Sequence, residues 1–174
     1  MPPKGSPSRP SHPPPPTTHR PRRAGPLPGT EAWRRWLAAG AWLHQFACWD
    51  IWATLTFAYP TGQGRAVGRL RDWLDRLAKE CGGRVICAYG VEGVPGNGVH
   101  IHAVVSFPGS ARVPVSMADS FWKWGHARIQ RFDPQQGACW YLAKHGDAWD
   151  VTYGRPSKHW PRQPGPLVTI LPAP

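Results

Sequence analysis

The sequence lacks several features that would assign its class directly. No apolar run approaches the roughly 18 residues of a membrane-spanning helix, and the basic N-terminus has no apolar secretory segment. The four cysteines include no Cys-x-x-Cys pair, and no Gly-x-x-x-x-Gly-Lys-Ser/Thr loop occurs. These absences argue against a membrane protein, a zinc ribbon, a disulfide scaffold and a P-loop ATPase. They favour a cytoplasmic protein with reduced thiols.

Acidic residues are also scarce, with 10 Asp and Glu against 21 Lys and Arg, for a formal net charge of +11. Residues 1–29 contain eleven prolines, five basic residues and no acidic residue. This composition predicts an extended basic tail at 1–29, a folded domain at 30–150 and a Pro-rich extension at 151–174. The basic charge and the 11 tryptophans together favour a nucleic acid as the partner.

Hydrophobic periodicity predicts alternating helices and strands in the folded part. The expected helices are 31–49, 65–81, 116–124 and 133–145. The expected strands are 51–58, 84–91, 99–107 and 126–132, with a further short strand considered at 167–171. Two strands joined by a short loop pair antiparallel. We therefore expect an α+β fold of the ferredoxin-like, split β-α-β type, with about five antiparallel strands and flanking helices.

End signals refine these helices. Thr30 and Asp133 are placed to cap the first and last helices, and Ser116 with Asp119 three residues later resembles a capping box. Gly82 follows the last apolar position of the second helix and is expected to end it. Gly40 lies inside the first helix and weakens that prediction.

The segment 92–107 carries a candidate metal site. Side chains two apart on a strand share a face, so His100 and His102 point away from the apolar core face that Ile101 helps to form. A loop centred on Gly96 places Glu92 opposite His100. Two imidazoles and one carboxylate suit a catalytic divalent cation, Mn²⁺ better than Mg²⁺. A His pair alone is more often an ordinary surface feature, and the opposed carboxylate is what favours a site.

The last predicted helix carries a candidate nucleophile. Tyr141 and Lys144 are three residues apart and so are neighbours on one helix face. A tyrosine hydroxyl has an ordinary pKa near 10 and needs help to attack, which a nearby cation provides. Without the metal site, the pair would be interpreted as an amphipathic helix edge.

Three ordered segments resemble the motifs of the HUH endonucleases, and in particular the single-tyrosine initiators of rolling-circle replication in plasmids and phages. They are Thr54-Leu55-Thr56-Phe57, His100-Ile101-His102 and Tyr141-x-x-Lys144. The resemblance covers about residues 50–146. It implies metal ligands at Glu92, His100 and His102, a nucleophile at Tyr141 and an assisting lysine at Lys144.

The resemblance further implies nicking and joining of single-stranded or hairpin origin DNA through a covalent 5′-phosphotyrosine, in the cytoplasm of a bacterium. A host helicase and a polymerase would complete replication. Candidate DNA contacts are Thr54, Thr56, Trp122, Trp124, Arg128, Trp140 and His145. Three alternatives stay open: another HUH enzyme such as a mobilisation nuclease or transposase, a non-catalytic ferredoxin-like nucleic-acid-binding module, and a structural metal-binding protein.

Overall fold

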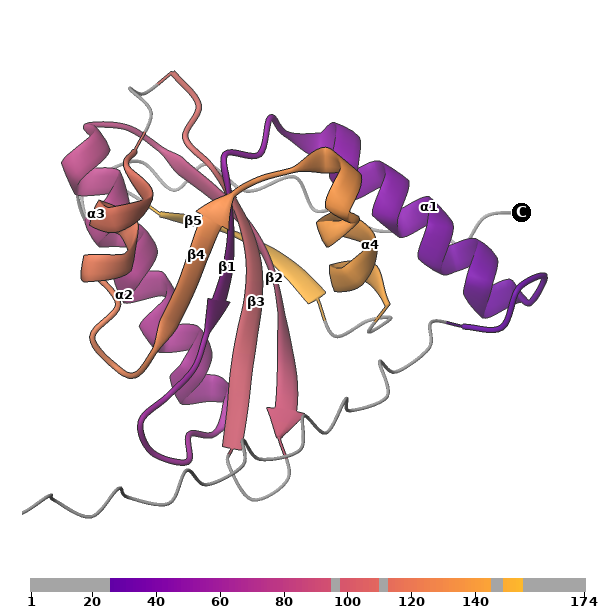
Figure 1. Ribbon diagram of the computed structural model, residues 1–174, viewed down its shortest axis with the longest axis horizontal. Helices are drawn as coiled ribbons and strands as arrows, with labels where there is room; N and C mark the ends of the chain where they lie inside the picture. The colour runs from indigo at the N-terminus through magenta and orange to yellow at the C-terminus, as the bar shows by residue number, and fades with distance from the viewer. Residues whose placement is uncertain (1–25, 95–97, 110–112, 145–148, 155–174) are drawn as a thin grey trace, which may run out of the picture.

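The structure, a computed structural model, describes residues 26–94, 98–109, 113–144 and 149–154 (Figure 1). Its helices are α1 (Glu31–Phe46), α2 (Gln63–Cys81), α3 (Val115–Ser120) and α4 (Ala138–Ala143), with a short 3₁₀ helix η1 (Pro134–Gln136). Its strands are β1 (Ile51–Leu55), β2 (Val85–Val94), β3 (Gly98–Ser106), β4 (Ala127–Arg131) and β5 (Trp149–Gly154). Among these helices, none combines the length and the apolar character that crossing a bilayer requires.

The five strands form one antiparallel sheet in the order β4-β1-β3-β2-β5. This arrangement confirms the predicted α+β class. Strand β5 pairs with β2 and runs to Gly154, past residue 150, where the folded domain was expected to end. The alternation of Trp149, Val151 and Tyr153 with Asp150 and Thr152 is a strand signal that the sequence-based prediction did not use. The strand considered at 167–171 lies outside the described residues.

Helices cover both faces of the sheet, α2 and α3 on one side and α1 and α4 on the other (Figure 1). The larger core lies under α2, whose buried residues are Ala66, Leu70, Trp73, Leu74, Leu77 and Ala78. They meet the odd-numbered side chains of β1 and β3, of which Ile101 is fully buried. Each large apolar side chain buried in this way contributes about 1.5–3 kcal/mol to folding. Most of these apolar residues are three or four positions apart in the sequence, a spacing that predicts one apolar helix face, and the structure confirms that face.

The opposite face carries a smaller core between the sheet and α1 and α4. Leu43 of α1, Val104 of β3 and Leu142 of α4 are fully buried there. These helices cover the part of the face around Val104. They leave His100 and Glu92, nearer the β2–β3 turn, half-buried. The sheet thus has one face for stability and one face divided between packing and polar chemistry.

Two of the predicted helix signals are confirmed. The Trp33 backbone N–H donates to Thr30 Oγ1 at 3.1 Å, which caps α1. Gly82 adopts a left-handed conformation with φ of +63° and ends α2. The capping box at Ser116 is wrong: α3 begins at Val115 after Pro114, without a side-chain cap, so Ser116 lies inside the helix.

The last helix is also shorter than predicted and is divided in two. The Gln135 backbone N–H donates to Asp133 Oδ1 at 2.9 Å, as the cap predicts, but the turn that follows is the 3₁₀ helix η1. Gly137 then takes a left-handed conformation with φ of +69°, and α4 starts after it. A left-handed residue cannot continue a right-handed helix, so Gly137 separates the two pieces.

Helices α1 and α4 approach closely at Gly40. A Cβ atom on Gly40 would overlap the indole of Trp140, and Trp36 Nε1 donates to the Trp140 backbone oxygen at 2.6 Å. Gly40 therefore weakens α1 as an isolated helix and permits the contact that positions α4.

We expect opposite effects from the same substitution in two helices. Gly40→Ala should lower the free energy of unfolding by about 1–3 kcal/mol, because the new methyl group displaces Trp140. Gly68→Ala is the matched control: Gly68 lies in α2 with no atom near the added Cβ, so the change should stabilise by about 0.5–1 kcal/mol. Chemical denaturation measures both. A Gly40→Ala protein as stable as the parent would contradict the close contact.

Stability should also fall at high pH because of Tyr89. This core side chain is 5% exposed, and its hydroxyl donates to Asp150 Oδ2 at 3.3 Å. Burial, and secondarily the charge of Asp150, raises the pKa of Tyr89 from 10.0 to about 12. Between these values the unfolded chain releases the proton while the folded chain keeps it, so unfolding is favoured by up to about 1.4 kcal/mol per pH unit.

Denaturation curves from pH 8 to 12 test this linkage. Tyr89→Phe should lose the hydrogen bond and be less stable near neutrality, yet its stability should decline less steeply above pH 10. Parallel declines in the two proteins would assign the alkaline sensitivity to other groups.

Candidate metal and nucleophile site

The β2–β3 hairpin brings the predicted ligands together. In its register Glu92 lies opposite His100 and Gly90 opposite His102, which confirms the predicted pairing of Glu92 with His100. His100 and His102 share a face because they are two residues apart on β3, while Ile101 between them points into the larger core. Strand alternation thus places the imidazoles away from that core.

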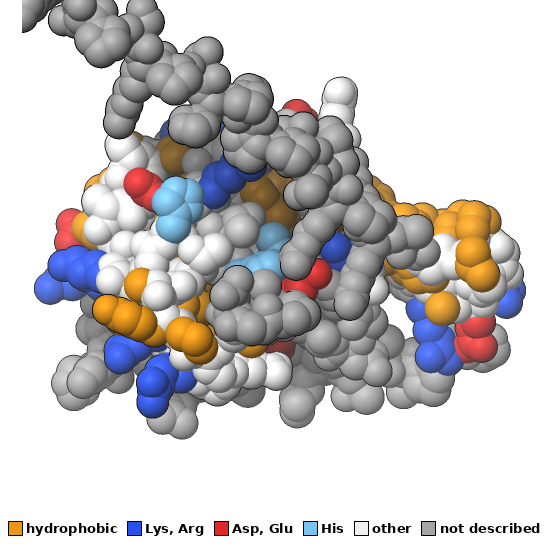
Figure 2. All heavy atoms as spheres, turned by 60° about the horizontal axis from the view of Figure 1, so that its bottom comes forward, with side chains coloured by type: hydrophobic (Ala, Val, Ile, Leu, Met, Phe, Trp, Pro, Cys, Tyr) orange, Lys and Arg blue, Asp and Glu red, His pale blue; other side chains and the backbone are white. Residues whose placement is uncertain are grey.

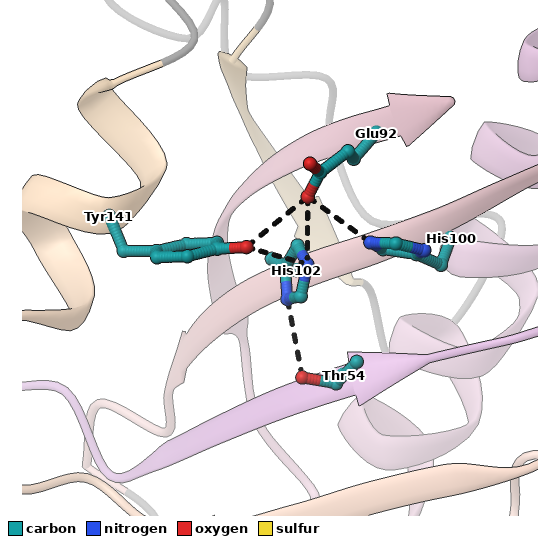
Figure 3. A network of polar contacts seen from close by, with 5 residues as sticks. All are labelled: Thr54, Glu92, His100, His102 and Tyr141. Atoms are coloured by element: carbon teal, nitrogen blue, oxygen red, sulfur yellow. Dashed lines mark hydrogen bonds and ion pairs between the residues drawn. The ribbon is translucent and has the colours of Figure 1, made fainter. Parts of the chain in front are cut away.

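The ligand atoms lie close enough to share one ion. Glu92 Oε2 is 3.2 Å from His100 Nε2 and 3.4 Å from His102 Nε2, and ligand atoms of all three residues lie within 4.8 Å of one another (Figure 3). Adjacent ligands of an octahedral ion with bonds of about 2.0–2.1 Å are roughly 3 Å apart. These three side chains could therefore hold a divalent cation with open positions for a substrate.

Thr54 orients one of the two imidazoles. It lies opposite His102 in the β1–β3 pairing, and its Oγ1 is 3.2 Å from His102 Nδ1. With the hydrogen on Nδ1, His102 donates to Thr54 and keeps the Nε2 lone pair facing Glu92 (Figure 3). The sequence analysis expected Thr54 to contact DNA; its position on the same face as His102 is the signal for this second role.

Tyr141 completes the cluster from the opposite side. Helix α4 directs its hydroxyl to Glu92, where it donates to Oε2 at 3.2 Å, and it also lies 3.4 Å from His102 Nε2 (Figure 3). Burial, and then the charge and hydrogen bond of Glu92, raises the pKa of Tyr141 to about 12. The hydroxyl is therefore less acidic than that of a free tyrosine. A cation bound at Glu92 would offset the charge that holds this proton.

Lys144 lies on the ring of Tyr141. Its Nζ is 3.3 Å from the centre of that ring, as expected for helix neighbours three residues apart. A cation over an aromatic face is favourable, so each side chain restrains the other. The lysine adds a positive charge beside the hydroxyl-bearing ring.

Trp52 is a site residue that the sequence analysis missed. Its indole stacks on His102, with ring centres 5.5 Å apart and planes at 13°, and meets the edge of Tyr141 at 5.8 Å. Trp52 precedes Thr54 by two residues on β1 and so shares its face. That spacing was the available signal, but the contact with Tyr141 depends on where α4 packs.

The other predicted DNA contacts are spread over different surroundings. Arg128 is exposed on β4 and lies directly opposite Thr54, so it shares the face of the candidate metal ligands. Thr56 Oγ1 donates to the His126 backbone oxygen at 2.8 Å, which fixes the entry to β4. Figure 2 shows the end of the molecule at the β2–β3 turn, which is the bottom of Figure 1. Histidine, acidic and basic side chains lie near one another there. His145 lies outside the described residues.

The three tryptophans among the predicted DNA contacts are all engaged in packing. Trp122 is 5% exposed and donates to the Thr56 backbone oxygen, so it offers no open ring face to a base. Trp124 is half-buried, packs against Trp122 and lies under the Arg69 guanidinium. Trp140 packs against Gly40 in the α1–α4 contact. These three tryptophans therefore serve packing in the folded protein.

Comparison of the chain with protein-family models, curated proteins and solved structures finds no match. The function proposed below therefore rests on the chemistry of Glu92, His100, His102 and Tyr141.

We expect the cluster to bind Mn²⁺ in a titration followed by the loss of the free-ion electron paramagnetic resonance signal. His102→Ala and Glu92→Gln each remove a ligand and should abolish measurable binding. Thr54→Val removes the partner of His102 Nδ1 and should weaken binding by about tenfold or more. His126→Ala, which changes an exposed histidine outside the cluster, should bind as the parent does. Equal affinity in the His102→Ala protein would exclude this cation site.

Proposed function

We propose that this chain is an HUH-type, metal-dependent endonuclease that nicks and joins single-stranded DNA, as an initiator of rolling-circle replication. The observation that carries the proposal is the single cluster formed by a tyrosine hydroxyl and three candidate metal ligands. Tyr141 donates to the carboxylate of Glu92 at 3.2 Å and lies 3.4 Å from the Nε2 of His102. A tyrosine that served only for packing would not need to place its hydroxyl among candidate metal ligands.

The reaction is the transfer of a phosphoryl group to tyrosine. The Tyr141 oxygen attacks the phosphorus in line, forming a new P–O bond while the bond to the 3′ oxygen of the preceding nucleotide breaks. The tyrosine proton is released and the leaving 3′ oxygen is protonated, which yields a 5′-phosphotyrosine and a free 3′-hydroxyl. Attack by that hydroxyl on the phosphotyrosine reseals the strand by the same chemistry in reverse.

The residues of the site divide this work. Glu92 accepts a hydrogen bond from the Tyr141 hydroxyl and so directs that hydroxyl toward the cluster. A bound divalent cation would polarise a non-bridging phosphate oxygen and stabilise the charge of the transition state. Lys144 contributes positive charge beside the tyrosine ring, where it favours the developing phenolate.

The form and charge of this surface support a nucleic acid as the substrate. The cluster lies on an open sheet face beside Arg128, and the whole chain has a net charge of +11. Such a surface favours a polyanion. The preference for a single strand comes from the resemblance to the HUH endonucleases. We propose origin DNA in single-stranded or hairpin form as the substrate, in a bacterial cytoplasm, with host helicase and polymerase as partners in replication.

Replacing Tyr141 with Phe should eliminate the covalent adduct and leave DNA binding intact, because only the attacking oxygen is lost. The protein is incubated with Mn²⁺ and a labelled pool of single-stranded hairpins that carry a randomised segment. Adducts are then resolved on a denaturing gel. The adduct should disappear below detection in Tyr141→Phe and in chelator.

Tyr59→Phe is the matched control, because Tyr59 is 81% exposed on a loop and its hydroxyl lies outside the cluster. It should form the adduct as the parent does. An adduct that persists in Tyr141→Phe would exclude this nucleophile. Binding of the pool without any adduct in the parent protein would favour the non-catalytic nucleic-acid-binding alternative.

A further inference from the structure

A pocket of about 120 Å³, open on one side, lies beside Tyr141. Two of its walls, Trp52 and Tyr141, also contact the candidate metal cluster, since both rings pack against His102. Its other walls are Gln130, Asp133, Gln136 and Ala138. Cavities of comparable size admit a single aromatic ring, and because this pocket is open on one side it can receive the six-membered ring of either a pyrimidine or a purine. A ligand in this pocket would lie next to a group bound at the Tyr141 hydroxyl.

The pocket combines aromatic walls with a chain of amide and carboxylate groups. Gln130 comes from β4, directly opposite Trp52 of β1, and its Nε2 donates to Gln136 Oε1 at 3.3 Å. Gln136 Nε2 in turn donates to Asp133 Oδ2 at 3.0 Å. The other oxygen of Asp133 accepts the Gln135 backbone N–H, which fixes the carboxylate in place. Each accepting oxygen has a second lone pair available for a ligand.

We propose that this pocket receives the base of the nucleotide adjoining the cleaved phosphate and prefers a base with an exocyclic amino group. This inference rests on the proposed function, because it places the scissile phosphate at Tyr141. Adenine, cytosine and guanine each carry an exocyclic amino group that can donate a hydrogen bond to Asp133. Thymine has no such group, and its only donor, the ring N3–H, lies between two carbonyl oxygens that the carboxylate repels. The preference is therefore for these three bases over thymine.

The charge of the pocket supports a base as its occupant. Asp133 is a fixed acceptor, and a carboxylate repels the phosphates of the DNA backbone. Arg128 lies two residues before Gln130 on β4 and is exposed on the same face, where it can take a phosphate instead. The protein thus offers a positive side chain for the DNA phosphates and, next to it, a pocket of amide and carboxylate groups for the base.

Sequencing of trapped adducts tests the inference. The parent protein is incubated with Mn²⁺ and single-stranded DNA carrying a randomised segment, and the DNA attached to Tyr141 and the released fragments are sequenced. One position next to the cleaved bond should be depleted of thymine. Asp133→Asn keeps the acceptor for the Gln135 backbone N–H and replaces the other oxygen by a donor. The bias against thymine at that one position should fall by roughly tenfold.

A second variant and a control separate this effect from general damage. Gln136→Leu removes the amide that donates to Asp133 Oδ2 and should weaken the base preference at the same DNA position. Because Gln136 is exposed, the variant should fold normally. Asp72→Asn changes an exposed aspartate on α2, across the sheet from the pocket, and should leave the whole profile unchanged. Thermal unfolding confirms that each variant is folded.

The possible failures are distinguishable. A parent protein that forms no Tyr141-dependent adduct overturns the proposed function and this inference with it. The base pocket alone is overturned if the parent forms adducts but Asp133→Asn does not change the base preference at that one position. This holds whether the base frequencies of the variant match those of the parent or its preference weakens equally at all positions.

Discussion

The antiparallel pairing of β2 with β3 is the constraint on which the rest of the structure depends. In this register Glu92 faces His100, while Val91 faces Ile101 on the other side of the sheet. A shift of one residue would turn the histidines into the core and the core side chains outward. The same pairing therefore determines both the burial of Ile101 beneath α2 and the meeting of the three polar ligands. Stability and chemistry are coupled through a single register.

The candidate nucleophile depends on a different contact. Helix α4 has six residues, too few to be stable by itself, so its position comes from packing against α1. Gly40 is essential here because it leaves room for Trp140, the residue before Tyr141. The tyrosine hydroxyl reaches Glu92 only because two helices that are about a hundred residues apart in the sequence fit closely together.

Glu92 is the electrostatic centre of the site. A single carboxylate oxygen is close to both imidazoles and to the Tyr141 hydroxyl. Its negative charge raises the pKa of that hydroxyl when no metal is bound, and the same charge would attract a cation. Together with burial, Glu92 therefore makes the Tyr141 hydroxyl less acidic, and a cation bound at the same carboxylate would offset this effect.

The sequence alone determined the α+β class, the apolar face of α2, the cap of α1 and the pairing of Glu92 with His100. All of these follow from local periodicity, end signals and hairpin geometry. Three features were decided only in the folded protein: the break at Gly137, the pairing of β5 with β2, and the roles of Trp52 and Thr54 around His102. The sequence could suggest Trp122 as a DNA contact, but its burial became evident only from packing. Local patterns report on neighbours along the chain, whereas these features arise from contacts between residues that are distant along it.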